Sequence, residues 1–230
     1  MVSPKEPEIR RMFDSIAPRY DLLNRLLSFR RDISWRRWAV KQLISHKQGT
    51  YLDVATGTAD VALEIKRQAP LSLTVALDFA SRMLDLAKKK VMGKGIELVR
   101  GDAMNMPFPD NAFDGAIVAY GVRNLPDRLS GLKEMRRVVK PHGRVVVLEF
   151  STPTGLGGMT YDIYLSRFLP WMGGLVSGDP KAYRYLHDSV KAFPPAQVFC
   201  DMMVQAKLAK VRYYPLTSGI TICYVGEKEG

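Results

Sequence analysis

The chain has 230 residues, 47% of them apolar and 25% charged, which provides enough apolar material for the core of one globular domain. Two cysteines that form no CxxC pair and only three histidines argue against a disulfide scaffold and a metal cluster, so we expect no metal. The net charge is +11, and residues 1–48 contain eleven Lys and Arg against five Asp and Glu. This excess suits a polyanion, an anionic lipid surface or an acidic substrate, and it equally suits the solvated face of a basic protein.

Residues 1–48 form the first of four expected segments and are predicted to be helical. Apolar and basic side chains recur at helical spacing in residues 9–17, 20–29 and 33–44. The amino terminus carries charges where a signal peptide has its apolar part, so no signal peptide is expected. The longest uncharged stretches, residues 151–161 and 168–178, are shorter than the ~18 residues of a spanning helix.

Residues 49–150 alternate short β-branched runs with stretches of helical period. The predicted strands cover residues 50–56, 73–78, 96–101, 115–120 and 144–150. The predicted helices cover residues 59–68, 81–91 and 127–139, the first starting at Thr58 or Asp60 and the third just after Asp127. This alternation predicts an α/β fold with a mostly parallel sheet and helices on both faces.

Residues 151–200 depart from this alternation. They begin with a glycine-rich stretch and continue as aromatic-rich helices over residues 161–172 and 182–190, which we interpret as a helical lid. Residues 201–230 return to strands at 209–216 and 220–228. The expected organisation is one domain over residues 1–230, with an N-terminal cover, a cofactor-binding core, a lid insertion and two last strands.

The loop after the first strand is the first candidate for a ligand site, because ligands of open α/β sheets bind beyond the carboxyl ends of the strands. Gly57 allows the backbone to approach a ligand closely. The loop lacks GxGxxG, so it does not fit the pyrophosphate of a dinucleotide. Asp53 or Asp60 could instead accept a hydrogen bond from the ammonium group of an amino-acid ligand. The alternative is an ordinary strand–helix turn.

Acidic residues also follow the second and third strands. Asp78 is placed to accept two hydrogen bonds from ribose hydroxyls, and Asp102 is placed to meet an adenine amino group. Met104 and Met106 could pack against the adenine ring. Together with Asp53, these acids at three successive strand ends predict a nucleoside site.

The order of DVATGTAD, ALDFASRML, RGDAMNMPFPDNAFD and RRVVKPHGRVVVLEF resembles the class I methyltransferase family. The resemblance implies a Rossmann-like, seven-stranded sheet and S-adenosylmethionine as the co-substrate. It implies that Gly57 and Thr58 line the methionine moiety, Asp78 the ribose, and Asp102 with Ala103 the adenine. Two residues depart from the family pattern. Ala59 replaces a glycine and is expected to narrow the loop, and His142 replaces the first glycine of a PGG turn away from the ligand.

Segments outside this common fold resemble the quinone C-methyltransferases that act on demethylmenaquinol and on the polyprenyl benzoquinol precursor of ubiquinone. The matching segments are IAPRYDLLNRLLSFRRDISWRRW, AYGVRNLPDR, LEFSTP and SGDPKAYRYLHDSVKAFP. They run in order along nearly the whole chain and match the demethylmenaquinone enzymes most closely. The resemblance implies methyl transfer to a ring carbon of a polyprenyl quinol.

The residues of the substrate side follow from this resemblance. We expect Arg123 to stabilise the quinolate oxygen, with a helix cap or a loop salt bridge as the alternative. Further residues are expected to form or brace the substrate pocket: Tyr20, Asp21, Asn24, Tyr120 and Asn124. The general base is not identified, and the candidates are Tyr20, Asp21, Tyr120, Tyr161, Tyr183 and His187.

A polyprenyl quinol resides in the bilayer, so the basic N-terminal helices are expected to dock transiently on an anionic membrane surface. The apolar residues expected to take part are Leu26, Leu27, Phe29, Trp35 and Trp38. The expected location is the cytoplasm, with docking at the inner face of the membrane; no nucleic-acid partner is expected, and a homodimer is left open. The alternatives are an RNA or other small-molecule methyltransferase and a non-catalytic S-adenosylmethionine-binding protein.

Overall fold

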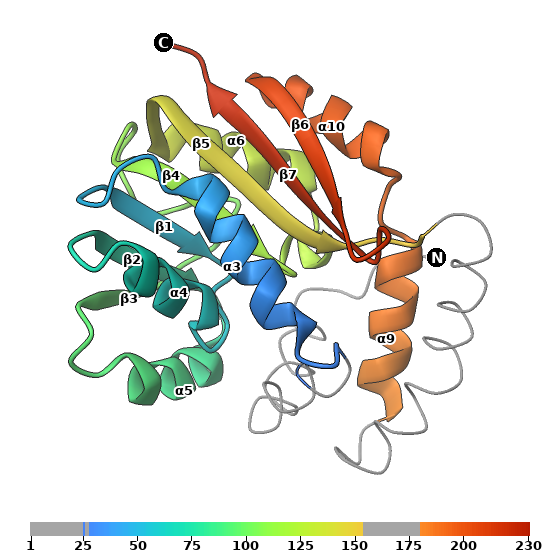
Figure 1. Ribbon diagram of the computed structural model, residues 1–230, viewed down its shortest axis with the longest axis horizontal. Helices are drawn as coiled ribbons and strands as arrows, with labels where there is room; N and C mark the ends of the chain where they lie inside the picture. Colours follow the sequence, from blue (N-terminus) through green and yellow to red (C-terminus); the bar gives the residue numbers. More distant parts are fainter. Residues whose placement is uncertain (1–24, 26–27, 154–179) are drawn as a thin grey trace.

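The computed structural model describes residue 25, residues 28–153 and residues 180–230. Within this part of the chain, strands and helices alternate as predicted (Figure 1). The strands are β1 (Thr50–Val54), β2 (Leu73–Asp78), β3 (Ile96–Arg100), β4 (Phe113–Ala119), β5 (Val139–Phe150), β6 (Leu208–Leu216) and β7 (Thr221–Lys228). The helices are α3 (Arg31–Leu43), α4 (Asp60–Gln68), α5 (Ser81–Val91), η2 (Val122–Asn124), α6 (Arg128–Val138), α9 (Pro180–Lys191) and α10 (Ala196–Gln205).

The strands form one seven-stranded sheet in the order β3-β2-β1-β4-β5-β7-β6. All neighbouring pairs are parallel except those of β7, which is antiparallel to both β5 and β6. The predicted mostly parallel, seven-stranded α/β fold is therefore confirmed. The strand order reverses between β1 and β4, and the loops after these two strands diverge there to leave a crevice in which a ligand can bind.

Helices cover both faces of the sheet because its central strands are apolar on both sides. In β5, Val145 and Val147 pack on the face covered by α6 and α10, whereas Val146 and Leu148 pack on the face covered by α3 and α4. Figure 1 shows α3 lying across the strands on its face. The two-residue repeat of a strand thus divides one run of apolar residues between two cores.

The start of α6 lies where the sequence predicts it. Asp127 is the N-cap, and its Oδ1 accepts hydrogen bonds from the backbone N–H groups of Leu129 and Ser130 at 3.0 and 3.2 Å. An aspartate in this position satisfies donors that the helix itself cannot. The helix that follows β1 begins at Asp60, the second of the two predicted starts. These two helix starts define where the loops that follow β1 and β4 end.

The third predicted N-terminal helix, residues 33–44, is confirmed as α3. The expectation that Trp35 faces a membrane is wrong. Trp35 is 4% exposed, packs in the core, and its Nε1 donates a hydrogen bond to Thr217 Oγ1 at 2.9 Å. Trp38 is partly buried with its ring edge against Tyr214. The side of α3 that carries the two tryptophans therefore faces the sheet. Phe29, just before α3, is 74% exposed.

The expected lid lies mostly in residues 154–179, outside the described part, as do the helices expected over residues 9–17 and most of 20–29. The helix expected over residues 182–190 is confirmed as α9. The expected segment boundary at residue 200 falls within α10, which packs on the sheet through Phe199 and Met203. Among the described residues, no helix is long and apolar enough to span a bilayer.

Candidate active site

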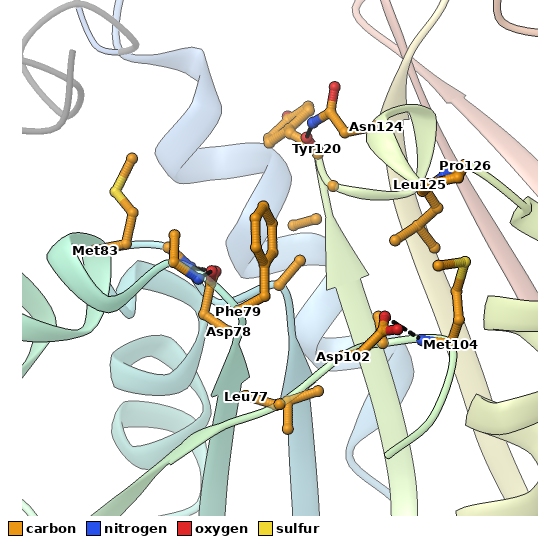
Figure 2. Close-up of a pocket in the computed structure, with 17 residues that line it drawn as sticks. Leu77, Asp78, Phe79, Met83, Asp102, Met104, Tyr120, Asn124, Leu125 and Pro126 are labelled. Carbon is orange, nitrogen blue, oxygen red and sulfur yellow. Dashed lines mark hydrogen bonds between the residues drawn. The ribbon is translucent and has the colours of Figure 1, made fainter. Parts of the chain in front are cut away.

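A pocket opens at the carboxyl ends of β1, β2, β3 and β4, at the point where the strand order reverses (Figure 2). It encloses about 840 Å³ of space, including its opening to solvent. Its walls are the loops that follow these four strands, as the sequence predicts. The lining residues are Ala55, Gly57, Leu77, Asp78, Phe79, Ala80, Met83, Gly101, Asp102, Ala103, Met104, Ala119, Tyr120, Gly121, Asn124, Leu125 and Pro126.

The loop after β1 turns through left-handed backbone conformations at Ala55, Gly57 and Ala59, whose φ angles are 52°, 56° and 68°. A Cβ atom added at Gly57 would meet no heavy atom of the other described residues within 4 Å, its chain neighbours aside. Glycine therefore supplies the left-handed conformation and leaves the space above it open to a ligand. Ala59 does not line the pocket, because its methyl group packs with Ala62 and other small residues. The narrowing of the loop that is expected from Ala59 stays a prediction.

Asp53 and Thr58 lie behind this loop rather than in the pocket. Asp53 is 1% exposed, and its carboxylate accepts hydrogen bonds from the hydroxyl of Thr56 and from the backbone N–H of Ala62 at 3.0 Å. Thr58 is buried and accepts a hydrogen bond from Lys90 Nζ at 3.0 Å. Neither residue lines the pocket, and Asp53 lies close enough to Asp78 for the two carboxyls to interact electrostatically.

Asp60 is also absent from the pocket lining. Its carboxylate pairs with Lys90 of α5 at 2.7 Å and with Arg36 of α3 at 3.4 Å. These ion pairs tie the start of α4 to both neighbouring helices. His142, the second departure from the family pattern, has a φ of 64° within β5 and does not line the pocket.

We expect an Asp53→Asn substitution to remove a pH-dependent loss of stability. Burial raises the pKa of the Asp53 carboxyl from its ordinary 3.8 to about 7. The stability linked to this group is therefore complete below about pH 4 and is lost as the pH rises through about 7. Urea unfolding at several pH values should show wild type becoming less stable relative to the variant over this range. A difference between the two proteins that does not change with pH would contradict this.

Asp78 connects the loops after β1 and β2. It lies at the end of β2, and its two carboxylate oxygens accept hydrogen bonds from the backbone N–H groups of Gly57 and Ala80 at 2.7 and 2.8 Å. A carboxylate can accept about four hydrogen bonds, so these two do not exhaust it. Asp78 lines the pocket between Phe79 and Met83 (Figure 2). It is thus a rigidly held anion in a mostly apolar wall.

Asp102 and Ala103 lie in the pocket wall after β3. The Asp102 carboxylate accepts a hydrogen bond from the backbone N–H of Met104 at 2.8 Å. The side chain of Met104 extends toward Leu125, on the wall opposite Phe79 (Figure 2). Phe79 on one side and Met104 with Leu125 on the other give the pocket two apolar walls (Figure 2). Met106, the other methionine expected there, is 3% exposed and belongs to the core instead.

Tyr120 and Asn124 line the pocket on the β4 side. The ring of Tyr120 stacks on Phe150 with 4.4 Å between centroids. Burial raises the pKa of the Tyr120 phenol above its ordinary value of 10.0, so this phenol stays protonated and does not serve as a ready general base. The side-chain oxygen of Asn124 accepts a hydrogen bond from the Tyr185 hydroxyl at 2.8 Å, which joins α9 to this wall.

Arg123 forms the loop salt bridge that was the alternative to its catalytic role. It is 7% exposed, and its guanidinium lies 2.7 Å from the carboxylate of Glu149 at the end of β5. The backbone N–H of Arg123 donates to the same carboxylate at 3.2 Å. Arg123 is not among the residues that line the pocket.

Several expected site residues fall outside the described part of the chain: Tyr20, Asp21, Asn24, Tyr161 and the side chain of Tyr183. Of the remaining base candidates, His187 is half-buried, with its Nδ1 3.0 Å from Asp188 Oδ1. Within the described residues, no group of three or more His, Cys, Asp or Glu side chains could hold a metal ion.

The model of the ubiE/COQ5 methyltransferase family matches residues 1–228, nearly the entire chain. The chain belongs to this family. The ubiE/COQ5 match includes the N-terminal segment and the segment before α9, most of which fall outside the described part of the chain.

Curated relatives of this ubiE/COQ5 methyltransferase carry similar names. A demethylmenaquinone methyltransferase from Thermus thermophilus is 47% identical over 94% of this chain and 100% of its own. A ubiquinone/menaquinone biosynthesis C-methyltransferase from Geotalea uraniireducens is 46% identical over 99% of both chains. Among solved structures, a SAM-dependent methyltransferase from Thermotoga maritima superposes with a TM-score of 0.67 at 18% identity, covering 95% of this chain and 99% of its own. That likeness shows the shared fold.

The ubiE/COQ5 pocket also contains residues that sequence reasoning missed. Phe79 and Met83 form one wall, and Leu125 with Pro126 forms part of the other. The sequence carried a signal for two of them, because Phe79 directly follows Asp78 and Leu125 directly follows Asn124. Met83 and Pro126 lie five and two residues beyond these selected residues. Glu149 and Tyr185 gave no such signal, because their partners Arg123 and Asn124 are 26 and 61 residues away in the chain.

Proposed function

We propose that this protein transfers the methyl group of S-adenosylmethionine to a ring carbon of demethylmenaquinol, or of a polyprenyl benzoquinol as the alternative acceptor. The observation that carries the proposal is the family match over residues 1–228, which extends beyond the common methyltransferase fold. The names of the curated relatives support the quinol as the acceptor class. The fold alone would not, since one architecture serves many acceptors.

The pocket fits the parts of S-adenosylmethionine. The Asp78 carboxylate is proposed to accept hydrogen bonds from the ribose hydroxyls, and the slot between Phe79 and Met104 to hold the adenine beside Asp102 and Ala103. Gly57, with open space above it, would then border the methionine moiety. S-adenosylmethionine carries no phosphate. The loop after β1 suits it, because this loop lacks the glycine pattern with which dinucleotide sites bind pyrophosphate.

S-adenosylmethionine supplies an electrophilic methyl group, so the protein must align a carbon nucleophile with it. Holding two reactants in line can lower the barrier by roughly 7–11 kcal/mol. The rigid β4 wall, with Tyr120 stacked on Phe150 and Asn124 held by Tyr185, is proposed to position the quinol ring. Tyr20, Asp21 and Asn24 are proposed to belong to the same substrate pocket. The apolar lining excludes water from the reacting atoms.

The proposed reaction is tested by supplying labelled S-adenosylmethionine with reduced demethylmenaquinone, a reduced polyprenyl benzoquinone precursor, or RNA. We expect label in the naphthoquinol, weaker labelling of the benzoquinol, and none in RNA. Label in neither quinol, from a protein that binds S-adenosylmethionine, would overturn the proposed acceptor. Label in RNA would favour a different class of methyltransferase.

We further propose that the protein acts in the cytoplasm and docks reversibly on the inner face of an anionic membrane, where polyprenyl quinols reside. Phe29 and the arginines at positions 30 and 31 are exposed at the first turn of α3. The Arg25 guanidinium lies 3.8 Å from the Asp60 carboxylate at the start of α4, which places this basic end of α3 on the pocket side of the sheet. A membrane bound there would face the opening of the pocket.

A Phe29→Ser substitution should weaken binding to phosphatidylglycerol vesicles at low salt by about tenfold, because burying a phenylalanine contributes roughly 1.5–3 kcal/mol. Sedimentation of protein with vesicles measures this, and added salt should release the wild type. Leu71→Ser is the matched control, since Leu71 is 70% exposed next to the amino end of β2, the opposite edge of the sheet. Equal loss in both variants, or in neither, would contradict docking through α3.

The proposal leaves a homodimer open and includes no nucleic-acid partner. Analytical ultracentrifugation of the purified chain, with and without S-adenosylmethionine, distinguishes one copy from two.

A further inference from the structure

Two arginines lie close together beside the pocket, but only one of them has a carboxylate partner. Arg123 in η2 pairs with Glu149 at 2.7 Å, and both side chains are almost fully buried. Arg128 is the first residue of α6, and one of its terminal nitrogens lies 3.5 Å from the backbone carbonyl oxygen of Arg123. Among the described residues, the pair of arginines with one glutamate leaves one positive charge in excess.

The excess charge resides on Arg128. No carboxylate of the described residues lies within ion-pair distance of its guanidinium, and its Nε is buried without a hydrogen-bond partner in the same part of the chain. The guanidinium stacks over the ring of Phe193 at 5.4 Å. Burial lowers the pKa of the Arg128 guanidinium, while Glu149 and Tyr185 act in the opposite direction.

This position is unfavourable for a cation in three respects. The amino end of α6 carries the positive end of the helix dipole, which repels a guanidinium. A second cation, Arg123, is adjacent. The nearby Asp127 carboxylate is occupied as the N-cap of the helix, bound to Leu129 and Ser130. A charge held against such local costs is typical of a site that binds a ligand of opposite charge.

Arg128 does not itself line the pocket, but it lies two residues beyond Pro126, which does. Asn124, Leu125 and Pro126, which connect Arg123 to the start of α6, line one side of the pocket (Figure 2). Tyr185 binds Asn124 from α9 and contributes to the electrostatics of both arginines. The cluster therefore borders the β4 wall, where the quinol ring is proposed to lie.

Resting on the proposed function, we propose that Arg128 binds the ionised ring oxygen of the quinol. The hydroxyl releases its proton to solvent, and the resulting oxyanion accepts hydrogen bonds from the guanidinium, which restores charge balance in the cluster. The negative charge is shared with the neighbouring ring carbon, which makes that carbon nucleophilic. Arg123, neutralised by Glu149, instead fixes the loop that holds Asn124. This assigns the anion contact to Arg128 rather than to Arg123.

The test compares two ring probes of nearly the same shape, 2-hydroxy-1,4-naphthoquinone, an anion at neutral pH, and neutral 1,4-naphthoquinone. Absorbance titrations give the affinity of the full-length protein for each. We expect wild type to prefer the anion, and Arg128→Met to lose at least about tenfold of anion affinity, the value of one charge-assisted hydrogen bond. Affinity for the neutral probe should change less than about twofold. Arg128→Lys should recover part of the preference.

Arg128→Met keeps an apolar side chain against Phe193, and replacing a partly buried charge without an ion-pair partner in this way need not destabilise the fold. Lys133→Gln is the matched control, because it removes an exposed cation from the same helix and should leave both affinities unchanged. Phe193→Leu removes the stacked ring without changing the charge and should retain the preference for the anion. Equal loss for both probes in Arg128→Met, or no preference in wild type, would overturn the inference.

The inference and the proposed function fail separately. Wild type that binds the anion through Arg128 but methylates no quinol would overturn the proposed function alone. Wild type that methylates demethylmenaquinol, with an Arg128→Met variant that binds the anion and turns over equally well, would overturn the inference alone.

Discussion

An Asp78→Asn variant should bind S-adenosylmethionine about 100-fold more weakly than wild type. Hydrogen bonds to a charged group contribute about 1.5–3 kcal/mol each, and two ribose hydroxyls would lose a carboxylate acceptor. An amide offers one acceptor oxygen, so one of the two backbone donors at Gly57 and Ala80 also loses its partner. Isothermal titration calorimetry measures the affinity directly.

The matched control for this prediction is Asp85→Asn, which removes an exposed carboxylate from α5, two residues beyond Met83. It should leave the affinity within about twofold, because an exposed charge is screened by solvent. An Asp78→Asn variant that binds as tightly as wild type would show that the nucleoside is held elsewhere.

A Glu149→Gln variant should lose about 3–5 kcal/mol of unfolding free energy, because it removes one partner of a buried ion pair. The glutamate is fully buried, and its loss would leave Arg123 and Arg128 as two neighbouring cations without a carboxylate. Urea denaturation, with the slope checked against wild type, gives the change in stability.

A surface ion pair provides the comparison. Glu227→Gln removes a carboxylate that lies 2.8 Å from Lys210 and 3.7 Å from Arg144 near the edge of the sheet, and it should cost less than about 1 kcal/mol. The double variant Arg123→Met, Glu149→Leu should recover part of the stability that Glu149→Gln loses, since it removes both charges together. Equal losses of unfolding free energy in Glu149→Gln and Glu227→Gln would contradict the claim that the buried ion pair contributes more to stability than the surface one.

The alternation of strands and helices could be predicted from the sequence because each element carries its own local signal. The run RVVVLEF is apolar throughout, as a strand covered on both faces must be, and β5 has this arrangement. Asp127 follows a proline and precedes an apolar repeat, which marks a helix start that the structure confirms. Such signals require no knowledge of distant contacts.

Which acid faces the pocket could not be predicted in the same way. Asp53 and Asp78 both occur near a strand end in sequence, but Asp53 lies within β1 and Asp78 is the last residue of β2. Thr56 and the backbone of Ala62 capture the Asp53 carboxylate beneath the loop. This difference depends on how the chain turns after each strand, which the identity of the acid does not reveal.

The orientation of α3 was likewise hidden from the sequence. Trp35 lies among arginines, a composition that fits both a membrane surface and a helix packed on a sheet. Its burial depends on β7 and on Thr217, more than 180 residues away, so only the tertiary structure decides the question. Phe29, a few residues earlier, remains exposed.

The most direct measurement is the position of the transferred methyl group. The purified protein is supplied with S-adenosylmethionine carrying a ¹³C-labelled methyl group and with reduced demethylmenaquinone, and the product is examined by nuclear magnetic resonance. Label in an aryl methyl group, bonded to a ring carbon, is the predicted result. Label in an oxygen-bound methyl group, or no labelled quinol while the protein binds S-adenosylmethionine, would contradict it.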